Sequence, residues 1–308
     1  MDSRLTDVSL RRLQVFLVVC DTLHMAQAAE RLGVAQPALS QQIHALERAL
    51  GVELFHRRKR GIDLTAAGEA CRTEAERLLS LHAGAIETVR RIGRGEMGRL
   101  TLGYVASAMF EPRFPAQLKR MRNAFPDVEL DLREGSISAL LAGVEAGDID
   151  VALVRAPIVA STLLRHQLHS GQDLVVILQP GHPLAKLPKI PIARLAPEPM
   201  IGFPDSEKVG IMRVAQQLAA AEGAQLHVRW RVAEIGSILG LVAAGLGFGI
   251  VPKNIALLAG AEIVSRPLAT SGARAELWLV WREDRETPAL LQFLKIATPQ
   301  DKPERVRT

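Results

Sequence analysis

The sequence predicts a mixed α/β protein with a small helical N-terminal part, one long helix, and a larger part in which strands and helices alternate. Residues 25–43 read MAQAAERLGVAQPALSQQI, two short helical patterns that meet at one glycine. Residues 65–92 carry one unbroken helical pattern. From Arg99 onward, strand-like and helix-like segments alternate, which is typical of a mostly parallel, open sheet covered by helices.

The first two helical patterns predict a helix-turn-helix. The first helix is expected over Met25–Leu32, and Gly33 supplies the left-handed residue that ends it. The second is expected to begin near Gln36–Pro37, because proline suits a first helical turn. In a helix-turn-helix the second helix lies in the DNA major groove, whereas an ordinary corner between two helices is the alternative. The residues expected to be buried together are Ala28, Leu32, Val34, Leu39 and Ile43, and those expected to point away are Ala38, Ser40, Gln41 and His44.

The flanking segments favour the DNA-binding interpretation. Upstream, residues 10–20 (LRRLQVFLVVC) predict a third helix that supports the corner. Downstream, two short strand-like pieces at 53–56 and 62–64 enclose the run RRKR, formed by Arg57, Arg58, Lys59 and Arg60. A two-stranded ribbon with a cationic tip is the wing of a winged helix-turn-helix. A solvated loop is the alternative, but beside a helix-turn-helix phosphate contact is favoured, since such contacts release counterions from DNA.

Composition is consistent with an intracellular regulator. The 308 residues suffice for two or three domains, and the net charge of +5 suits an anionic partner. Cys20 and Cys71 show no metal-ligand spacing, so neither a metal site nor a disulfide is expected. The longest apolar run, residues 238–252, contains four glycines and is too broken for a membrane helix. With no cleavable apolar segment at the N-terminus, a cytoplasmic location is expected.

The long helix is expected to pair with a second copy of itself. Thr65 can cap its start, and an apolar stripe follows. A helix of this length between two domains cannot bury its stripe against either one alone, so a coiled-coil-like dimer is predicted. Packing on the downstream domain is the alternative. The segment GRGEMG (93–98) is expected to be a flexible joint. The stripe is formed by Ala70, Ala75, Leu78, Leu79, Ala85, Ile86 and Val89.

The alternating part predicts two lobes with a ligand cleft between them. A first strand–helix round ends near residue 155, a second begins near residue 172, and the final strand and helix (275–297) return to the first lobe. This order predicts a hinged, periplasmic-binding-like fold with ligands at the carboxyl ends of strands. The run GLGFG (245–249) is not a dinucleotide fingerprint, because it follows a helix and precedes a strand. No cofactor is therefore expected.

At this point the sequence resembles the LysR-type transcriptional regulators over essentially all of its length. The most specific part is residues 16–69, from FLVVCDTLHMAQAAERLG to DLTAAGE, which match the N-terminal signature of that family in order and spacing. The resemblance implies a winged helix-turn-helix DNA-binding domain at 1–65 and a linker, dimerisation helix and hinge at 66–95. It also implies effector lobe I at 96–165 plus 268–308, and lobe II at 166–267. The implied partners are a double-stranded promoter operator, a small-molecule effector, and further copies of the chain in a homodimer or homotetramer.

The DNA contacts implied by the resemblance lie on the second helix and the wing. Two positions depart from the usual family pattern. Ala35 stands where serine commonly caps the recognition helix, which should weaken that terminus by about 1 kcal/mol. Gln41 stands where arginine is frequent, and glutamine can pair bidentately with adenine. The implied DNA-binding residues are Gln36, Pro37, Ser40, Gln41, His44, Arg57, Arg58, Lys59 and Arg60.

The effector contacts rest on a narrower resemblance. Residues 149–157, 176–185 and 200–204 resemble the branch of the family that senses aromatic catabolites and muconate-like acids. Hydroxyls at helix starts and an arginine after a strand suit a carboxylate. Helix capping is the alternative role for each serine, and an interlobe salt bridge is the alternative for Arg155. The implied cleft residues are Ser107, Ser136, Ser138, Arg155, Phe203 and Pro204.

The sequence also bears on an enzymatic function. It shows no G-x-S-x-G elbow, no His/Asp/Glu cluster at metal-ligand spacing, and no cysteine with an evident histidine partner. Catalytic groups need not be adjacent in sequence, so a small-acid-binding protein or enzyme of two-lobed α/β fold is the alternative function. Neither would use the N-terminal 65 residues. The prediction is therefore a DNA-binding transcriptional regulator, not an enzyme, that responds to a small carboxylate or aromatic effector.

Overall fold

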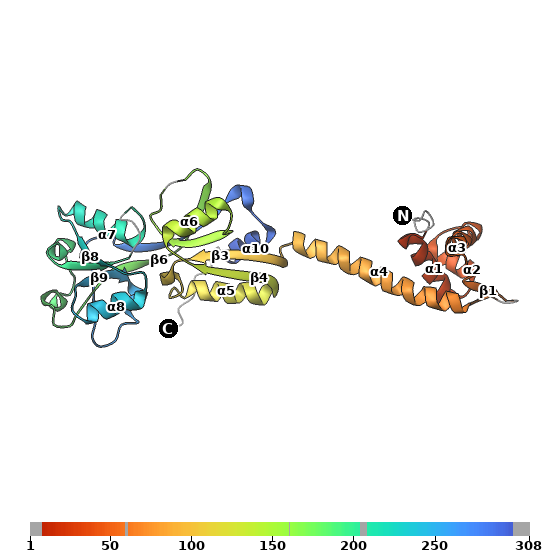
Figure 1. Cartoon of the computed structure of the whole chain (residues 1–308), viewed down its shortest axis with the longest axis horizontal. Helices are drawn as coiled ribbons and strands as arrows, with labels where there is room; N and C mark the ends of the chain where they lie inside the picture. Colours follow the sequence, from red (N-terminus) through yellow and green to blue (C-terminus); the bar gives the residue numbers. More distant parts are fainter. Residues whose placement is uncertain (1–7, 59–60, 160, 204–207, 298–308) are drawn as a thin grey trace, which may run out of the picture. The chain divides into compact units, whose positions relative to one another are not determined.

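The computed structural model describes residues 8–58, 61–159, 161–203 and 208–297 of the chain. The chain forms two compact units, one up to Arg90 and one from Arg91 onward. Figure 1 labels the elements of both.

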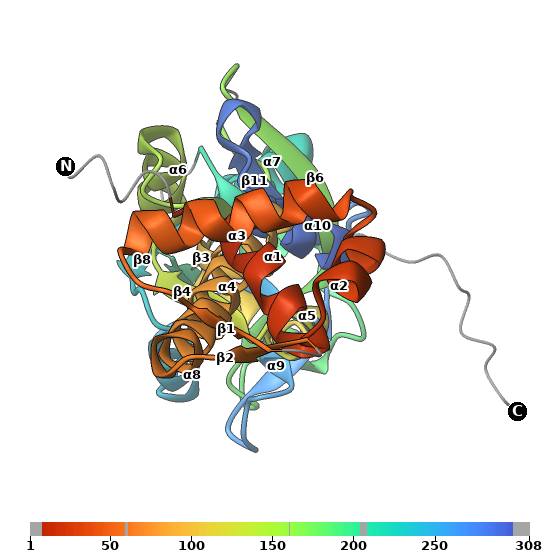
Figure 2. The ribbon, with the colours of Figure 1, turned by 90° about the vertical axis from the view of Figure 1, so that its right-hand side faces the viewer.

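The first unit is a helix-turn-helix with a supporting helix and a β-hairpin. Helix α1 (Leu10–Thr22) packs against α2 (Met25–Leu32) and α3 (Gln36–Leu50). Strands β1 (Phe55–Arg57) and β2 (Ile62–Leu64) pair antiparallel and form the predicted ribbon. Figure 2 shows this unit facing the viewer, with the hairpin beside the three helices. The buried centre of the unit includes Leu13, Phe16, Val19, Ala28, Leu39, Ile43, Leu46 and Leu54.

One residue of the predicted buried set is exposed. Gly33 ends α2 in the left-handed conformation (φ 66°), as predicted. Val34, which follows it, is 38% exposed. The prediction of a buried Val34 was wrong because the residue lies in the turn between the helices, where the helical periodicity on which it rested no longer applies.

Helix α4 (Ala66–Gly93) begins as predicted and carries an exposed apolar stripe. The Thr65 hydroxyl accepts a hydrogen bond from the Gly68 amide at 2.9 Å, which caps the helix. Leu78, Leu81 and Val89 are 47%, 62% and 70% exposed. Residues 78, 81, 85, 89 and 92 recur at helical spacing, so they share one face of the helix. Leu79 and Ile86, which the sequence assigned to the stripe, lie to one side of this face.

The second unit contains a nine-stranded sheet with strand order β4-β3-β5-β11-β6-β9-β7-β8, and β10 pairs with β6. The pairs β3–β4, β3–β5, β7–β8 and β7–β9 are parallel. The strands in the middle of the sheet, β6 and β11, pair antiparallel with all their neighbours. The sheet is therefore parallel at its two ends, as predicted, and antiparallel in the middle. The strands are β3 (Met97–Tyr104), β4 (Asp127–Glu134), β5 (Val151–Arg155), β6 (Leu164–Leu178), β7 (Pro199–Gly202), β8 (His227–Arg231), β9 (Phe248–Pro252), β10 (Val264–Pro267) and β11 (Arg274–Arg282).

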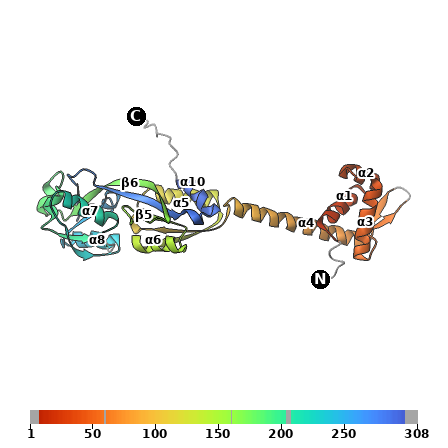
Figure 3. The ribbon, with the colours of Figure 1, turned by 90° about the horizontal axis from the view of Figure 1, so that it is seen from above.

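Three hydrophobic cores lie along this sheet, and the third, which includes Ile177, Ile238 and Val251, packs α8 against β6 and β9. The first is formed by β3, β4 and β5 with their helices and includes Phe114, Leu153 and Phe293. The second includes Met212 and Phe248. Strand β6 contributes to the first two, so it runs from one lobe into the other, as Figure 3 shows. The helices are α5 (Arg113–Ala124), α6 (Ile137–Ala146), α7 (Gly210–Ala221), α8 (Ile235–Ala243), α9 (Lys253–Ala256) and α10 (Pro288–Ala297).

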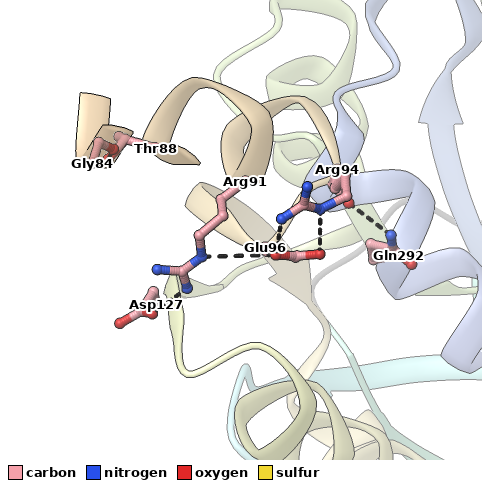
Figure 4. A network of polar contacts seen from close by, with 7 residues as sticks. All are labelled: Gly84, Thr88, Arg91, Arg94, Glu96, Asp127 and Gln292. Atoms are coloured by element: carbon pink, nitrogen blue, oxygen red, sulfur yellow. Dashed lines mark hydrogen bonds and ion pairs between the residues drawn. The ribbon is translucent and has the colours of Figure 1, made fainter. Parts of the chain in front are cut away.

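The segment between α4 and β3, which the sequence predicts to be a flexible joint, makes several contacts with the second unit. Arg94 pairs with Glu96 at 2.7 Å, and Arg91 pairs with Asp127 at the start of β4 (Figure 4). The Gln292 side chain of α10 donates to the Arg94 carbonyl at 2.7 Å. A Cβ on Gly95 would lie 2.3 Å from the carbonyl oxygen of Pro288, so only glycine fits this turn. The turn is therefore held to two elements of the second unit.

Candidate nucleic-acid interface and effector cleft

The polar face of α3 lies beside the hairpin in the first unit. Gln36, Ser40 and His44, each one helical turn apart, line a concavity of about 570 Å³ together with Arg57 and Arg58 of the hairpin. Pro37 and Gln41 are exposed on the adjoining strip of α3, outside the residues that line this concavity. The structure thus brings together five of the predicted DNA-binding residues. The predicted residues Lys59 and Arg60 lie outside the described residues.

Hydrogen bonds join α3 to the hairpin. Arg57 Nη2 lies 3.4 Å from His44 Nε2, and because a guanidinium only donates, this imidazole nitrogen accepts. His44 Nδ1 then donates to Glu47 Oε2 at 3.1 Å. The other oxygen of Glu47 accepts from the Leu54 amide at 2.9 Å. Glu47 therefore orients the imidazole, a role that its sequence position did not indicate.

The second arginine of the hairpin is paired with an acid. Arg58 Nε donates to Asp63 Oδ2 at 2.6 Å, and both side chains are more than half exposed. An exposed pair of this kind contributes about 0–1 kcal/mol to stability, so it can exchange its partner for a phosphate at low cost. No pattern in the sequence indicates this role of Asp63.

In the second unit, four predicted residues line one cavity. Ser107 follows β3, Ser136 follows β4, Arg155 ends β5, and Phe203 follows β7. The cavity has a volume of about 210 Å³, and its apolar wall includes Val209, Ile211 and Met212. The carboxyl ends of parallel strands thus meet at one cleft, as the fold predicts. Ser138 lies in the first turn of α6 and is not among the lining residues, and Pro204 lies outside the described residues.

Arg155 is the most deeply buried polar group of this cleft. It is 2% exposed. Its Nε donates to Ser107 Oγ at 3.1 Å, and its Nη1 and Nη2 donate to the carbonyl oxygens of Ala275 and Ser107. All of these acceptors are neutral, and no carboxylate forms an ion pair with Arg155 among the described residues. Burial lowers the pKa of the guanidinium to about 10, although the charge of the nearby Glu111 acts to raise it.

The two serines of the cleft differ in role. The Ser136 hydroxyl accepts from the Ala139 amide at 3.3 Å and therefore caps α6 while also lining the cleft. The Ser107 hydroxyl is 3.1 Å from Arg155 Nε and supports that side chain. Helix capping therefore accounts for Ser136 and not for Ser107.

A buried polar network next to Arg155 was not predicted from the sequence. The buried Glu111 carboxylate accepts from the Gln172 amide at 2.5 Å. His169 Nε2 contacts Gln117 Oε1 at 2.6 Å, and its Nδ1 contacts the Ser170 hydroxyl at 3.2 Å. Burial, followed by the charges of Arg113 and Arg155, lowers the pKa of His169 to about 4. These residues come from segments far apart in the sequence, so no local pattern could reveal them.

Comparison with known proteins decides the family. Residues 93–301 match the model of the LysR substrate binding domain, and residues 10–69 match that of the bacterial regulatory helix-turn-helix proteins of the lysR family. The chain belongs to the LysR family. As a member of it, the protein is a DNA-binding transcriptional regulator with an effector-binding domain and not an enzyme, which confirms the predicted class.

Relatives of this LysR-family regulator match along nearly their whole length. The chain is 33% identical over 288 residues to the uncharacterized HTH-type transcriptional regulator YnfL of Escherichia coli K12, covering 93% of this chain and 97% of YnfL. It is 32% identical to the regulator AlsR of Bacillus subtilis 168, covering 95% and 96%. Among solved structures, CbnR, a LysR family transcriptional regulator, matches with a TM-score of 0.79 and 25% identity, covering 94% of this chain and all of CbnR.

Two further observations concern metals and membranes. Among the residues described by the structure, no group of three or more His, Cys, Asp or Glu side chains could hold a metal ion. No helix in the same part of the chain combines the length and apolar character that a membrane span requires.

Proposed function

We propose that this regulator responds to a small carboxylate held by Arg155 in the cleft of the second unit. The observation that carries the proposal is a buried guanidinium that lines the cleft and has only neutral acceptors. A buried charge without an ion-pair partner is costly even beside the nearby charge of Glu111, and an anionic ligand offsets that cost with charge-assisted hydrogen bonds.

The walls of the cleft define the rest of the ligand. Phe203, Val209, Ile211 and Met212 present an apolar surface to the ligand. The other polar side chains of the lining are Ser107, Ser136 and the exposed Glu134 at the end of β4. An acid with an apolar or aromatic body fits this combination, because apolar walls bind the body and the convergent polar groups orient the charged end. The aromatic and muconate-like acids suggested by the sequence belong to this class.

On the DNA side, we propose that α3 reads an operator in the major groove while Arg57 and Arg58 contact phosphates. The concavity formed by α3 and the hairpin supports this assignment. Full-length CbnR has been solved in complex with its target DNA, and that structure matches this chain with a TM-score of 0.77 and 25% identity. We assign DNA binding to residues 1–65 and effector binding to residues 96–308.

The exposed stripe of α4 supports a homodimer through residues 66–91, and further contacts between effector domains build a tetramer. Two copies of the first unit are needed to contact two half-sites of an operator. An effector that binds one arrangement of the oligomer more tightly than another shifts the equilibrium between them. A regulator that binds promoter DNA acts where that DNA lies, so we propose a cytoplasmic location.

Calorimetric titration of the full-length protein with benzoate and with benzamide tests the effector proposal. Benzoate carries the charge that Arg155 needs, whereas benzamide has the same shape without it. We expect benzoate to bind at least about tenfold more tightly, and Arg155→Met to remove the difference. Ser138→Ala is the matched control, because Ser138 does not line the cleft. Equal binding of acid and amide, or benzoate binding that survives Arg155→Met, would overturn the proposal.

Selection of an operator from random duplex DNA tests the DNA-binding proposal separately. We expect the full-length protein to enrich a sequence with two related half-sites and to bind it more tightly than random DNA. Enrichment of no sequence, with equal affinity for all duplexes, would contradict the assignment of α3 as a reading helix.

A further inference from the structure

A second cavity of the effector unit lies between α7 and β11. It has a volume of about 410 Å³ and shares no lining residue with the effector cleft. Its wall includes Pro157, which follows β5, and Gln217 and Leu218 of α7. The remaining polar wall is formed by Arg274, Glu276 and Trp278.

These three residues of β11 lie on one face of the strand. Successive side chains of a strand point to opposite faces, so residues 274, 276 and 278 share one side. Ala275 and Leu277 between them are fully buried in the core. The cavity therefore receives a cation, an anion and an aromatic ring in a row from a single strand.

Both charged side chains retain hydrogen-bonding capacity. Arg274 Nη2 donates to the Gly171 carbonyl at 3.4 Å, which occupies one of its five N–H groups. Glu276 Oε2 accepts from the Trp278 indole N–H at 3.0 Å, and its second oxygen is a further acceptor. Within the described part of the chain, no ion pair joins Arg274 to Glu276, although they are two residues apart on the same strand face.

The aromatic ring is fixed in orientation. The His166 imidazole stacks on the Trp278 indole with centroids 4.5 Å apart and planes 7° from parallel. The hydrogen bond to Glu276 holds the indole from its edge. Leu218 adds apolar surface on the opposite wall of the cavity.

We propose that this cavity is a second small-molecule site that takes a zwitterionic α-amino acid with an apolar or aromatic side chain. The ligand carboxylate pairs with Arg274, its ammonium pairs with Glu276, and its side chain packs against Trp278 and Leu218. A ligand with only one charge would satisfy one partner and desolvate the other, which disfavours simple acids and simple amines.

The cavity adjoins the effector cleft through shared elements. The Pro157 carbonyl accepts from the Gly210 amide at 2.8 Å, which ties the loop after Arg155 to the start of α7. Ile211 and Met212 of α7 line the cleft, while Gln217 and Leu218 of the same helix line the second cavity. The proposed site does not depend on a ligand in the cleft, so it goes beyond the proposed function.

Calorimetry on the full-length protein with L-phenylalanine and L-leucine tests the site. The matched analogues of phenylalanine are 3-phenylpropanoate, which lacks the ammonium, and 2-phenylethylamine, which lacks the carboxylate. We expect at least one amino acid to bind, and each analogue of phenylalanine to bind about tenfold more weakly or not at all. Binding of neither amino acid, or equal binding of an analogue, would refute the proposal.

Variants then locate the site. Arg274→Gln and Glu276→Gln should each weaken amino-acid binding by about tenfold. The melting temperature of the free protein should not change, because Arg274 is exposed and the amide oxygen introduced by Glu276→Gln can still accept from the indole. Phe203→Ala, which changes a residue of the effector cleft that does not line the second cavity, should leave amino-acid binding intact. Loss of binding in Phe203→Ala with retention in Arg274→Gln would place the amino acid in the effector cleft and overturn the inference.

Discussion

The two candidate sites of this regulator place polar side chains in opposite surroundings. Gln36, Gln41 and His44 are exposed on α3, whereas Ser107 and Arg155 are buried at the cleft. DNA is a large ligand that brings its phosphates and base edges to an open surface. A small effector must instead be enclosed to lose enough water contact.

Because the two sites differ in burial, their charged side chains also differ in how much they affect the stability of the fold. The exposed Arg58–Asp63 pair is screened by solvent and contributes little to stability. The buried Arg155 and His169 lie where an unmatched charge costs far more. Substitutions in the first unit should therefore change binding while leaving the fold intact, and substitutions in the buried network should change both.

The largest effect is expected on α4. Its exposed side chains on one face are apolar, whereas those on the exposed face of α3 are polar. Leu81→Glu with Val89→Glu places charges in the stripe and should reduce the oligomer to smaller species. Operator affinity should fall by about 10²–10⁴-fold, because the second half-site is no longer tethered. Light scattering and gel retardation measure the two effects. Thr73→Glu with Ser80→Glu, on the opposite face of α4, is the control, and an intact oligomer in the stripe variant would remove α4 from the interface.

The next largest effect concerns His169 in the buried network. Its folded-state pKa of about 4 lies below the unfolded value of 6.5, so below pH 6.5 the unfolded state binds the proton first. The contribution of the neutral His169 to the free energy of unfolding is therefore fully present above pH 6.5. As the pH falls from 6.5 to 4, the free energy of unfolding drops by about 3 kcal/mol. Denaturant unfolding of the wild type and His169→Gln at both pH values measures it. The same pH dependence in both proteins would show that His169 is not the group responsible.

A smaller effect is expected at Gln41 on the open face of α3. Gln41→Ala should cost about 1–3 kcal/mol on the selected operator and relax the preference at one base pair. The melting temperature should not change, because Gln41 is exposed. Gel retardation on operator and random DNA separates the two classes of contact: equal losses on both would assign Gln41 to the backbone and not to a base.

The smallest effect is expected at the hairpin. Arg57→Ala should weaken binding to all duplexes alike and flatten the slope of log affinity against log salt by about 0.9. Arg48→Ala, at the far end of α3, serves as a cationic control. A slope that is unchanged by Arg57→Ala and equal to that of the control would make the hairpin arginine a solvated group.

The first unit could be predicted closely from the sequence because its signals are local. Helix α2 begins and ends at Met25 and Leu32 as predicted, and Gly33 and the cap at Thr65 are where the pattern indicated. The error at Val34 came from extending helical periodicity through a turn. Lys59 and Arg60 remain predictions.

The effector unit could be predicted only in part, because its contacts join distant segments. The rule that ligands meet strand ends indicated Ser107 and Arg155, and these do line one cleft. The antiparallel pairing of β6 with β11 has no local signature, because it depends on the register of two distant strands. The hydrogen bond between Glu111 and Gln172 has none either, because the two residues are 61 positions apart. Ser138 is predicted to precede the helix together with Ser136, but α6 begins at Ile137, and the helical turn directs the two side chains differently.

The start of the recognition helix has one further consequence. Ala35 has an extended backbone (φ −70°, ψ 137°) and offers no side-chain acceptor to the first amides of α3. A phosphate oxygen of bound DNA can accept from these amides in place of the missing hydroxyl. We therefore expect bound DNA to complete the first turn of α3. In hydrogen-exchange measurements, its amides should exchange rapidly in the free protein and become protected when the operator binds, while those of α1 stay protected throughout.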